Sequence, residues 1–184
     1  MFEMKRSVTL SLITIICGAY LLQMLDPSLQ IKLALLSNTY DGQGVENGQW
    51  YRLFTVALTH GGLTHLAFNM FSLLVLGNPL EAAFGKARFL LIFFISLLTG
   101  SLASLYLTTA GVYSVGASGA VFGLFGALMI VGKRIGANVK EIGVIIGLNF
   151  ALGFVFGGVD WRAHLGGLVG GAVTTFILLR ITRL

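Results

Sequence analysis

The 184-residue sequence predicts an all-α integral membrane protein whose helices cross the bilayer six times. The composition is the first observation behind this prediction. The chain is 56% hydrophobic and only 10% charged, whereas a soluble domain usually carries about 25% charged residues. The second observation is that the apolar residues form long stretches almost free of charge. Together these observations exclude an ordinary cytosolic enzyme, a disordered chain and a nucleic-acid-binding domain.

Six stretches approach the roughly 20 mostly apolar residues that a spanning helix needs. They cover residues 7–25, 60–77, 89–109, 116–132, 142–159 and 163–180. The first follows Lys5 and Arg6, but it is long and no small-residue cleavage site precedes Asp26-Pro27, so we interpret it as a retained span rather than a signal peptide. We expect one membrane domain over residues 1–184, without a soluble extra domain.

The longest segment between spans is an outer loop at about residues 26–59. It contains turn residues such as Asp41-Gly42 and Asn47-Gly48. Trp50 favours a position among the lipid headgroups. We expect this loop to lie on the membrane surface or partly within it.

The positive residues predict the orientation of the chain, because cytoplasmic loops are enriched in Lys and Arg. With the N-terminus inside, nine of the twelve face the cytoplasm and three face outward. The nine are Lys5, Arg6, Lys86, Arg88, Lys133, Arg134, Lys140, Arg180 and Arg183, and the three are Lys32, Arg52 and Arg162. Both termini are therefore expected in the cytoplasm, and the arrangement fits a bacterial inner membrane.

Polar side chains within spans are costly and suggest function. His65 and Asn69 are four residues apart in the second span and share a helix face. His60 is five residues from His65, about 500° of helical turn, so the two should point different ways. Ser118 begins the fourth span and His164 the sixth.

These residues are expected at similar depth in the membrane. The second, fourth and sixth spans all enter from the outer side. Ser118 lies about two residues into its span, His164 about one and His65 about five, which spreads them over only about 6 Å.

This set of side chains predicts acyl transfer by a Ser-His dyad. The Ser118 hydroxyl needs a base to become nucleophilic, and His164 can serve as that base. We find no Asp or Glu in the outer half of a span to complete a triad. His65, Asn69 and the free Ser118 N–H at the helix start can donate to an oxyanion.

Glycine motifs predict how the dyad is brought together. Three GxxxG pairs occur in the fourth and sixth spans, and such faces let helix backbones approach closely. The pairs are Gly119–Gly123, Gly166–Gly170 and Gly167–Gly171. Close packing of these two spans would place Ser118 near His164, with Phe122 beside the imidazole.

The sequence lacks the residues that other protease and transport mechanisms require. The sequence holds no His-Glu-x-x-His zinc string, and Cys17 is its only cysteine. Asp26, Asp41 and Asp160 are interpreted as loop or boundary residues, so an aspartyl protease is not predicted. A proton-coupled transporter would need a carboxylate at mid-membrane. No metal or cofactor is expected.

Four blocks of sequence resemble the rhomboid intramembrane serine proteases of the minimal six-span bacterial type. They are Gly116–Gly119 (GASG), Ala163–Gly167 (AHLGG), the His60, His65 and Asn69 pattern, and the pair formed by Trp50-x-Arg52 with Glu81-x-x-x-Gly85. The blocks follow one another in the order the family requires and cover about two thirds of the chain.

The resemblance implies a role for each matching residue. Ser118 would be the nucleophile, His164 the general base and acid, and His65 and Asn69 the oxyanion donors. A supporting or structural role falls to His60, Gly116, Phe122, Gly167, Trp50, Arg52 and Glu81. Many relatives have Tyr where this chain has Phe122, so a role for that hydroxyl does not carry over. The implied substrates are single-span membrane proteins in the lipid bilayer, and no nucleic acid.

Two other function classes stay open at this stage. One is a catalytically silent rhomboid-like binder of membrane helices, which an intact Ser118 and His164 disfavour. The other is a small transporter or channel made of glycine-packed helices, which the lack of buried carboxylates disfavours.

Overall fold

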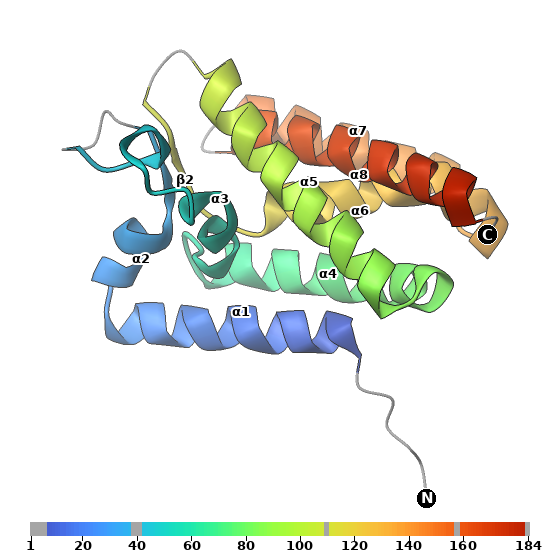
Figure 1. Ribbon diagram of the computed structural model, residues 1–184, viewed down its shortest axis with the longest axis horizontal. Coiled ribbons are helices and arrows are strands. Elements are labelled where there is room, and N and C mark those ends of the chain that lie inside the picture. Colours follow the sequence, from blue (N-terminus) through green and yellow to red (C-terminus); the bar gives the residue numbers. More distant parts are fainter. Residues whose placement is uncertain (1–6, 38–41, 109–110, 157–158, 183–184) are drawn as a thin grey trace, which may run out of the picture.

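Helices occupy all six predicted stretches in the computed structural model, which describes residues 7–37, 42–108, 111–156 and 159–182 (Figure 1). They are α1 (Val8–Leu25), α4 (Leu63–Phe84), α5 (Lys86–Leu107), α6 (Ser118–Val131), α7 (Val139–Phe156) and α8 (Trp161–Thr182). Within the described residues, five helices are long and apolar enough to cross a membrane, namely all of these except α7. The chain is therefore an all-helical membrane protein.

Some residues used in the sequence predictions lie outside the described part of the chain. They are the cationic residues Lys5, Arg6 and Arg183, the turn residue Asp41 and residues 157–158 of the predicted fifth span.

The second predicted span, residues 60–77, is displaced in the structure. Helix α4 begins only at Leu63 and runs to Phe84, with Pro79 inside it. His60 therefore lies in the connection before the helix. The predicted end at 77 is wrong because Glu81 remains on the helix with its carboxylate fully engaged.

Glu81 caps the start of α1 from another helix. Its carboxylate accepts hydrogen bonds from the Ser7 hydroxyl (2.9 Å), the Val8 and Thr9 backbone N–H groups (both 2.8 Å) and the Thr9 hydroxyl (2.7 Å). The first N–H groups of a helix lack intrahelical partners and favour a negative charge. This contact joins the beginning of α1 to the end of α4.

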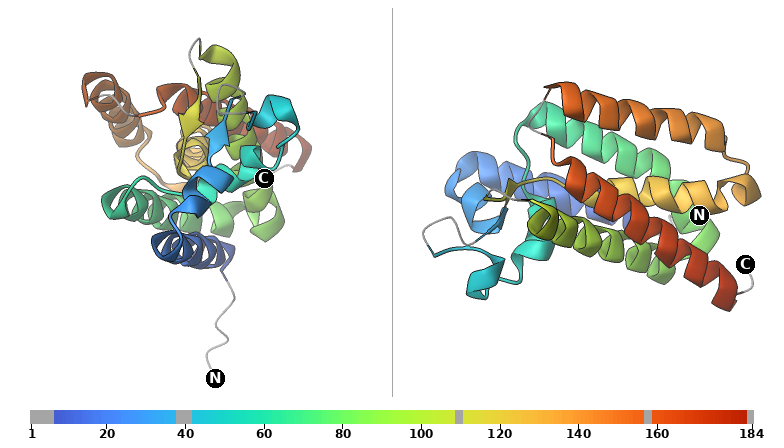
Figure 2. Two further views of the ribbon diagram at one scale, coloured as in Figure 1. Left: turned by 90° about the vertical axis from the view of Figure 1, so that its left-hand side faces the viewer. Right: turned by 90° about the horizontal axis from the view of Figure 1, so that it is seen from above.

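Helix α6 lies at the centre of the bundle, with the other helices around it (Figure 2). Glycines let it approach α8 backbone to backbone. A Cβ on Gly167 would collide with the Gly119 carbonyl oxygen, and a Cβ on Gly171 with that of Gly123. The predicted close packing of these two helices is confirmed.

The second glycine pair of α8 faces a different helix. A Cβ on Gly166 would lie 2.5 Å from the Thr99 carbonyl oxygen, and one on Gly170 would collide with the Thr99 hydroxyl. Helix α8 therefore packs closely on α5 as well as on α6.

The outer loop is more ordered than the sequence predicts. After α1 it contains α2 (Ser28–Leu33), β1 (Leu35–Leu36), η1 (Val45–Asn47), α3 (Arg52–Thr55) and η2 (Val56–Leu58). Strand β1 pairs antiparallel with β2 (Tyr113–Ser114), in the register Leu35 to Ser114 and Leu36 to Tyr113. This pairing was not predicted. It ties the loop to the segment before α6, at the end of the bundle where α4, α6 and α8 begin (Figure 1).

Arg52 holds the outer loop together from inside it. The side chain is 1% exposed. It donates to the carbonyl oxygens of Ile31 and Ala34 (both 2.7 Å) and to the side-chain oxygens of Gln49 (2.6 Å) and Gln43 (3.1 Å). These neutral oxygens satisfy a buried guanidinium. Trp50, which belongs to the same sequence block, is exposed.

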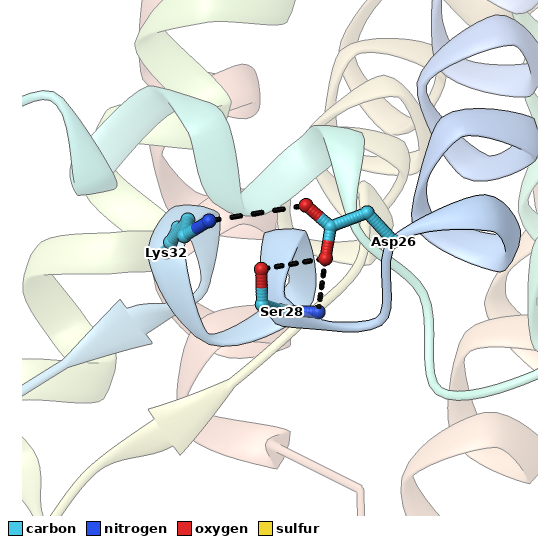
Figure 3. A network of polar contacts seen from close by, with 3 residues as sticks. All are labelled: Asp26, Ser28 and Lys32. Atoms are coloured by element: carbon cyan, nitrogen blue, oxygen red, sulfur yellow. Dashed lines mark hydrogen bonds and ion pairs between the residues drawn. The ribbon is translucent and has the colours of Figure 1, made fainter.

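A small polar network turns the chain from α1 into α2 (Figure 3). The Ser28 hydroxyl and backbone N–H donate to Asp26 Oδ1 at 2.6 and 3.0 Å, and Lys32 Nζ lies 3.8 Å from Asp26 Oδ2. The hydrogen bonds from Ser28 lower the pKa of the Asp26 carboxyl.

The glycine contact predicts a large difference between two Gly→Ala substitutions. Gly167→Ala should destabilise the protein by about 1–3 kcal/mol or more, because the new methyl group forces the α6 and α8 backbones apart. Gly18→Ala in α1 is the matched control, since nothing lies within 4 Å of the position that its new methyl group would take. Thermal unfolding in detergent measures both. Equal unfolding temperatures for the two variants would contradict the contact.

The carboxylate cap predicts a second stability difference. Glu81→Gln should lower the free energy of unfolding by about 2 kcal/mol, and with it the unfolding temperature. The substitution replaces hydrogen bonds to a charged acceptor with weaker ones. It also places the amide N–H₂ opposite other donors. Glu141→Gln at the exposed start of α7 is the control, because within the described residues its carboxylate accepts a hydrogen bond only from nearby Asn138. The cap would be refuted if both variants unfolded at the wild-type temperature.

Candidate active site

Ser118 is the first residue of α6 and follows a tight turn. Gly116 has φ +114°, a conformation that side chains with a Cβ rarely adopt. Its Cβ would also lie 2.7 Å from His65 Cε1. Glycine at this position therefore lets the His65 ring lie against the turn. The Ser118 N–H is in the first turn of α6 and has no intrahelical acceptor.

His164 lies in the first turn of α8 with its ring against α6. The side chain is 8% exposed. Its ring stacks on Phe122, with centroids 3.9 Å apart and planes 11° from parallel. The Phe150 ring of α7 meets it edge-on at 6.3 Å. Phe122 is one helical turn after Ser118, so the stacking holds the imidazole beside the helix that carries the serine.

The two residues of the predicted dyad lie on helices that pack closely, but no direct bond joins them. Among the described residues, no hydrogen bond joins Ser118 to His164, and His164 Nδ1 is buried without a partner. Catalytic hydrogen bonds are often long before substrate binds. A cavity of about 10 Å³ lined by Ser118, Ser101 and Ala163 adjoins the serine, which is roughly the space of one water molecule.

His65 and Asn69 are the third and seventh residues of α4. Asn69 Nδ2 donates to the His65 carbonyl oxygen at 2.9 Å. Asn69 Oδ1 is buried and has no partner in the described part of the chain. His65 thus lies against the turn before Ser118, and Asn69 lies one helical turn farther from it.

The three key residues lie near the starts of three helices. Ser118, His65 and His164 are the first, third and fourth residues of helices that begin at the same end (Figure 1). Three residues of helical rise span about 4.5 Å. The offsets predicted from the sequence, about two residues for Ser118, one for His164 and five for His65, differ from these helix positions.

His60 contacts both the turn before Ser118 and the His65 ring. Its Nε2 accepts the Ala117 N–H at 3.5 Å, and its ring meets the His65 ring edge-on at 5.1 Å. The expectation that His60 and His65 point different ways is wrong, because His60 is not on the helix and the helical rotation does not apply to it. Gln23 of α1 holds the His60 backbone.

Asp160, which the sequence placed at a boundary, and Ser104 make contacts near His164 that the sequence reasoning did not predict. Asp160 Oδ1 accepts the Ala163 N–H at 3.1 Å and the Asp160 carbonyl oxygen accepts the His164 N–H at 3.1 Å, so this residue caps α8. The Ser104 hydroxyl of α5 donates to the other carboxylate oxygen. An Asp just before a helical stretch is a known capping signal. Its bond to Ser104 has no comparable local signal.

Comparison with known proteins assigns the family. A family model described as "Rhomboid domain" matches residues 47–181. The rhomboid protease GluP of Bacillus subtilis is 40% identical over 135 residues, which is 69% of this chain and 26% of GluP. YdcA of the same bacterium is 37% identical over 142 residues, which is 74% of this chain and 71% of YdcA.

A plant relative extends this similarity beyond bacteria. RHOMBOID-like protein 5 of Arabidopsis thaliana is 41% identical over 143 residues, which is 73% of this chain and 46% of the relative. The chain thus spans about a quarter of GluP and about half of the plant protein, but most of YdcA. Because the family match covers most of the chain, including the helices that carry Ser118 and His164, this protein belongs to the rhomboid family.

Proposed function

We propose that this protein is an intramembrane serine endopeptidase with Ser118 as nucleophile and His164 as general base and acid. The observation that carries the proposal is the position of these residues on the first turns of α6 and α8, whose backbones touch at Gly119 and Gly167. The similarity to GluP, which is named a rhomboid protease, supports it.

The proposed reaction runs through an acyl-enzyme. His164 takes the Ser118 proton as the oxygen attacks the scissile carbonyl, then gives the proton to the leaving amine. Water then attacks the acyl carbonyl as His164 takes its proton, and His164 returns that proton to the Ser118 oxygen as the carbon–oxygen bond to the serine breaks. The cavity beside Ser118 has room for about one water molecule, and His164 is not among its lining residues. No metal or cofactor takes part.

Stabilisation of the oxyanion is assigned to His65, Asn69 and the Ser118 N–H. The contact of the His65 ring with Gly116 supports its part, since it lies beside the turn that presents the serine. The second hydrogen of the Asn69 amide remains for a substrate oxygen. Donors of this kind act strongly where water is scarce.

The membrane arrangement is also part of the proposal. Helix α7 completes six spans in a single domain over residues 1–184, and both termini face the cytoplasm of a bacterial cell. Cationic residues at the far end of the bundle, such as Lys86, Lys133 and Arg180, support this orientation. The dyad then opens toward the outer side. Its substrates are single-span membrane proteins that present an unwound segment.

Loss of either dyad residue should abolish cleavage. Purified protein in detergent is expected to cut a single-span reporter, and Ser118→Ala or His164→Ala should lower the rate by about a thousandfold or more. Ser11→Ala, at an exposed position of α1, is the control and should cut like wild type. A serine-directed phosphonate probe should label wild type and not Ser118→Ala.

Cleavage that survives Ser118→Ala would overturn the mechanism. A folded wild-type protein that neither cuts the reporter nor reacts with the probe would favour the silent helix binder. Solute flux through liposomes that Ser118→Ala leaves unchanged would favour the transporter.

The oxyanion assignment predicts a loss in kcat rather than in KM. His65→Ala should lower kcat by about 10²–10³-fold, because its bond forms only as the oxyanion develops. Asn69→Ala should act in the same direction. Thr64→Ala, at the exposed neighbouring position of α4, serves as control. Steady-state cleavage kinetics separate the two constants, and an effect confined to KM would refute the assignment.

A further inference from the structure

Helix α1 reaches the proposed site through one side chain that the mechanism does not use. Gln23 is a half-buried amide near the outer end of a mostly apolar helix. Polar groups inside spans are costly and call for a specific partner. Helix α1 also precedes residues 47–181, so the family match does not include it.

The Gln23 amide makes two hydrogen bonds to a single residue. Its Nε2 donates to the His60 carbonyl oxygen at 2.8 Å, and its Oε1 accepts the His60 N–H at 3.1 Å. The amide thus pairs with the backbone of His60 as a neighbouring strand would. Tyr20, one turn earlier on α1, meets the His60 ring edge-on at 6.4 Å. Both the backbone and the ring of His60 are therefore located by α1.

His60 passes this constraint on to two parts of the site. Its Nε2 accepts the N–H of Ala117, the residue before Ser118. An accepting Nε2 requires a neutral ring that carries its hydrogen on Nδ1. The His60 ring also meets the His65 ring edge-on, with the ring centroids 5.1 Å apart. His60 is 0% exposed, so a shift of its backbone must move these neighbours.

We propose that Gln23 is a positioning residue, which fixes the His60 backbone and through it holds both the Gly116–Ala117 turn and the His65 ring. This inference rests on the proposed function, because those two elements present the nucleophile and an oxyanion donor. Loss of residues that orient the ligands of a metal site typically lowers activity about 10–100-fold, and we expect a loss of the same size for Gln23.

The test compares Gln23→Met with a matched variant at the other end of α1. Methionine keeps the length of the side chain and removes both hydrogen bonds. Thr9→Val removes one hydrogen bond to Glu81 and lies about 21 Å away along the helix. Both substitutions weaken the attachment of α1, so both should lower the unfolding temperature. Only Gln23→Met should disturb the site.

Two readouts distinguish positioning from general stability. In cleavage assays, kcat should fall about 10–100-fold in Gln23→Met with KM within about twofold of wild type, and Thr9→Val should keep the wild-type kcat. In hydrogen–deuterium exchange, the amides of residues 57–62 and 115–118 should exchange about tenfold faster or more in Gln23→Met alone.

Either of two results would overturn the inference. One is unchanged exchange at 115–118 in Gln23→Met. The other is an equal loss of kcat in the two variants, which would reduce Gln23 to a stabilising contact. A wild-type protein without cleavage would count against the proposed function alone, since the exchange experiment still decides whether Gln23 holds the turn.

Discussion

Gly119 and Gly167 bring the backbones of α6 and α8 so close that a methyl group on Gly167 would collide with the Gly119 carbonyl oxygen. Ser118 comes one residue before this contact and His164 three residues before it. The side chains of the proposed dyad therefore leave their helices from the place where the two backbones meet. Without that approach, a serine and a histidine on separate helices would be held apart by the usual interaxial distance of about 8–10 Å.

Close packing fixes the separation of the helices but not their sliding along each other. Asp160 restrains the sliding of α8 along its neighbours. It caps α8, and its carboxylate also accepts the Ser104 hydroxyl of α5. Arg162 adds a bond from its Nε to the Leu107 carbonyl oxygen at the end of α5 (2.8 Å). The first turn of α8, and with it His164, is thereby tied to α5 at a defined height, while the glycines set its distance from α6.

The sequence predicts the features that depend on local patterns. It does not predict those that depend on contacts between residues far apart in the chain. Apolar stretches and GxxxG spacing are local patterns, so the helices and the pairing of α6 with α8 were predictable. The bonds of Gln23, Arg52 and Ser104 go to backbone and side-chain partners that only the assembled fold brings within reach. The end of the second span was predicted too early for the same reason, because a charge such as Glu81 argues against continuing a span unless its distant donors at the start of α1 are known. Residue spacing predicts which helices pack together. It does not predict the sub-ångström placement of side chains on which a Ser118–His164 bond depends.

The surroundings of His164 suggest how a base can be oriented without an acid. In a triad, a carboxylate holds the imidazole in place. Here the Asp160 carboxylate is engaged by Ser104 and the Ala163 N–H, and within the described residues His164 Nδ1 has no partner. Burying a further carboxylate beside the ring would carry a desolvation cost of several kcal/mol. Stacking on Phe122 orients the ring without that cost, because the contact is apolar and fixes the plane of the imidazole. The stacking therefore sets the tilt of the imidazole and leaves its position within that plane free.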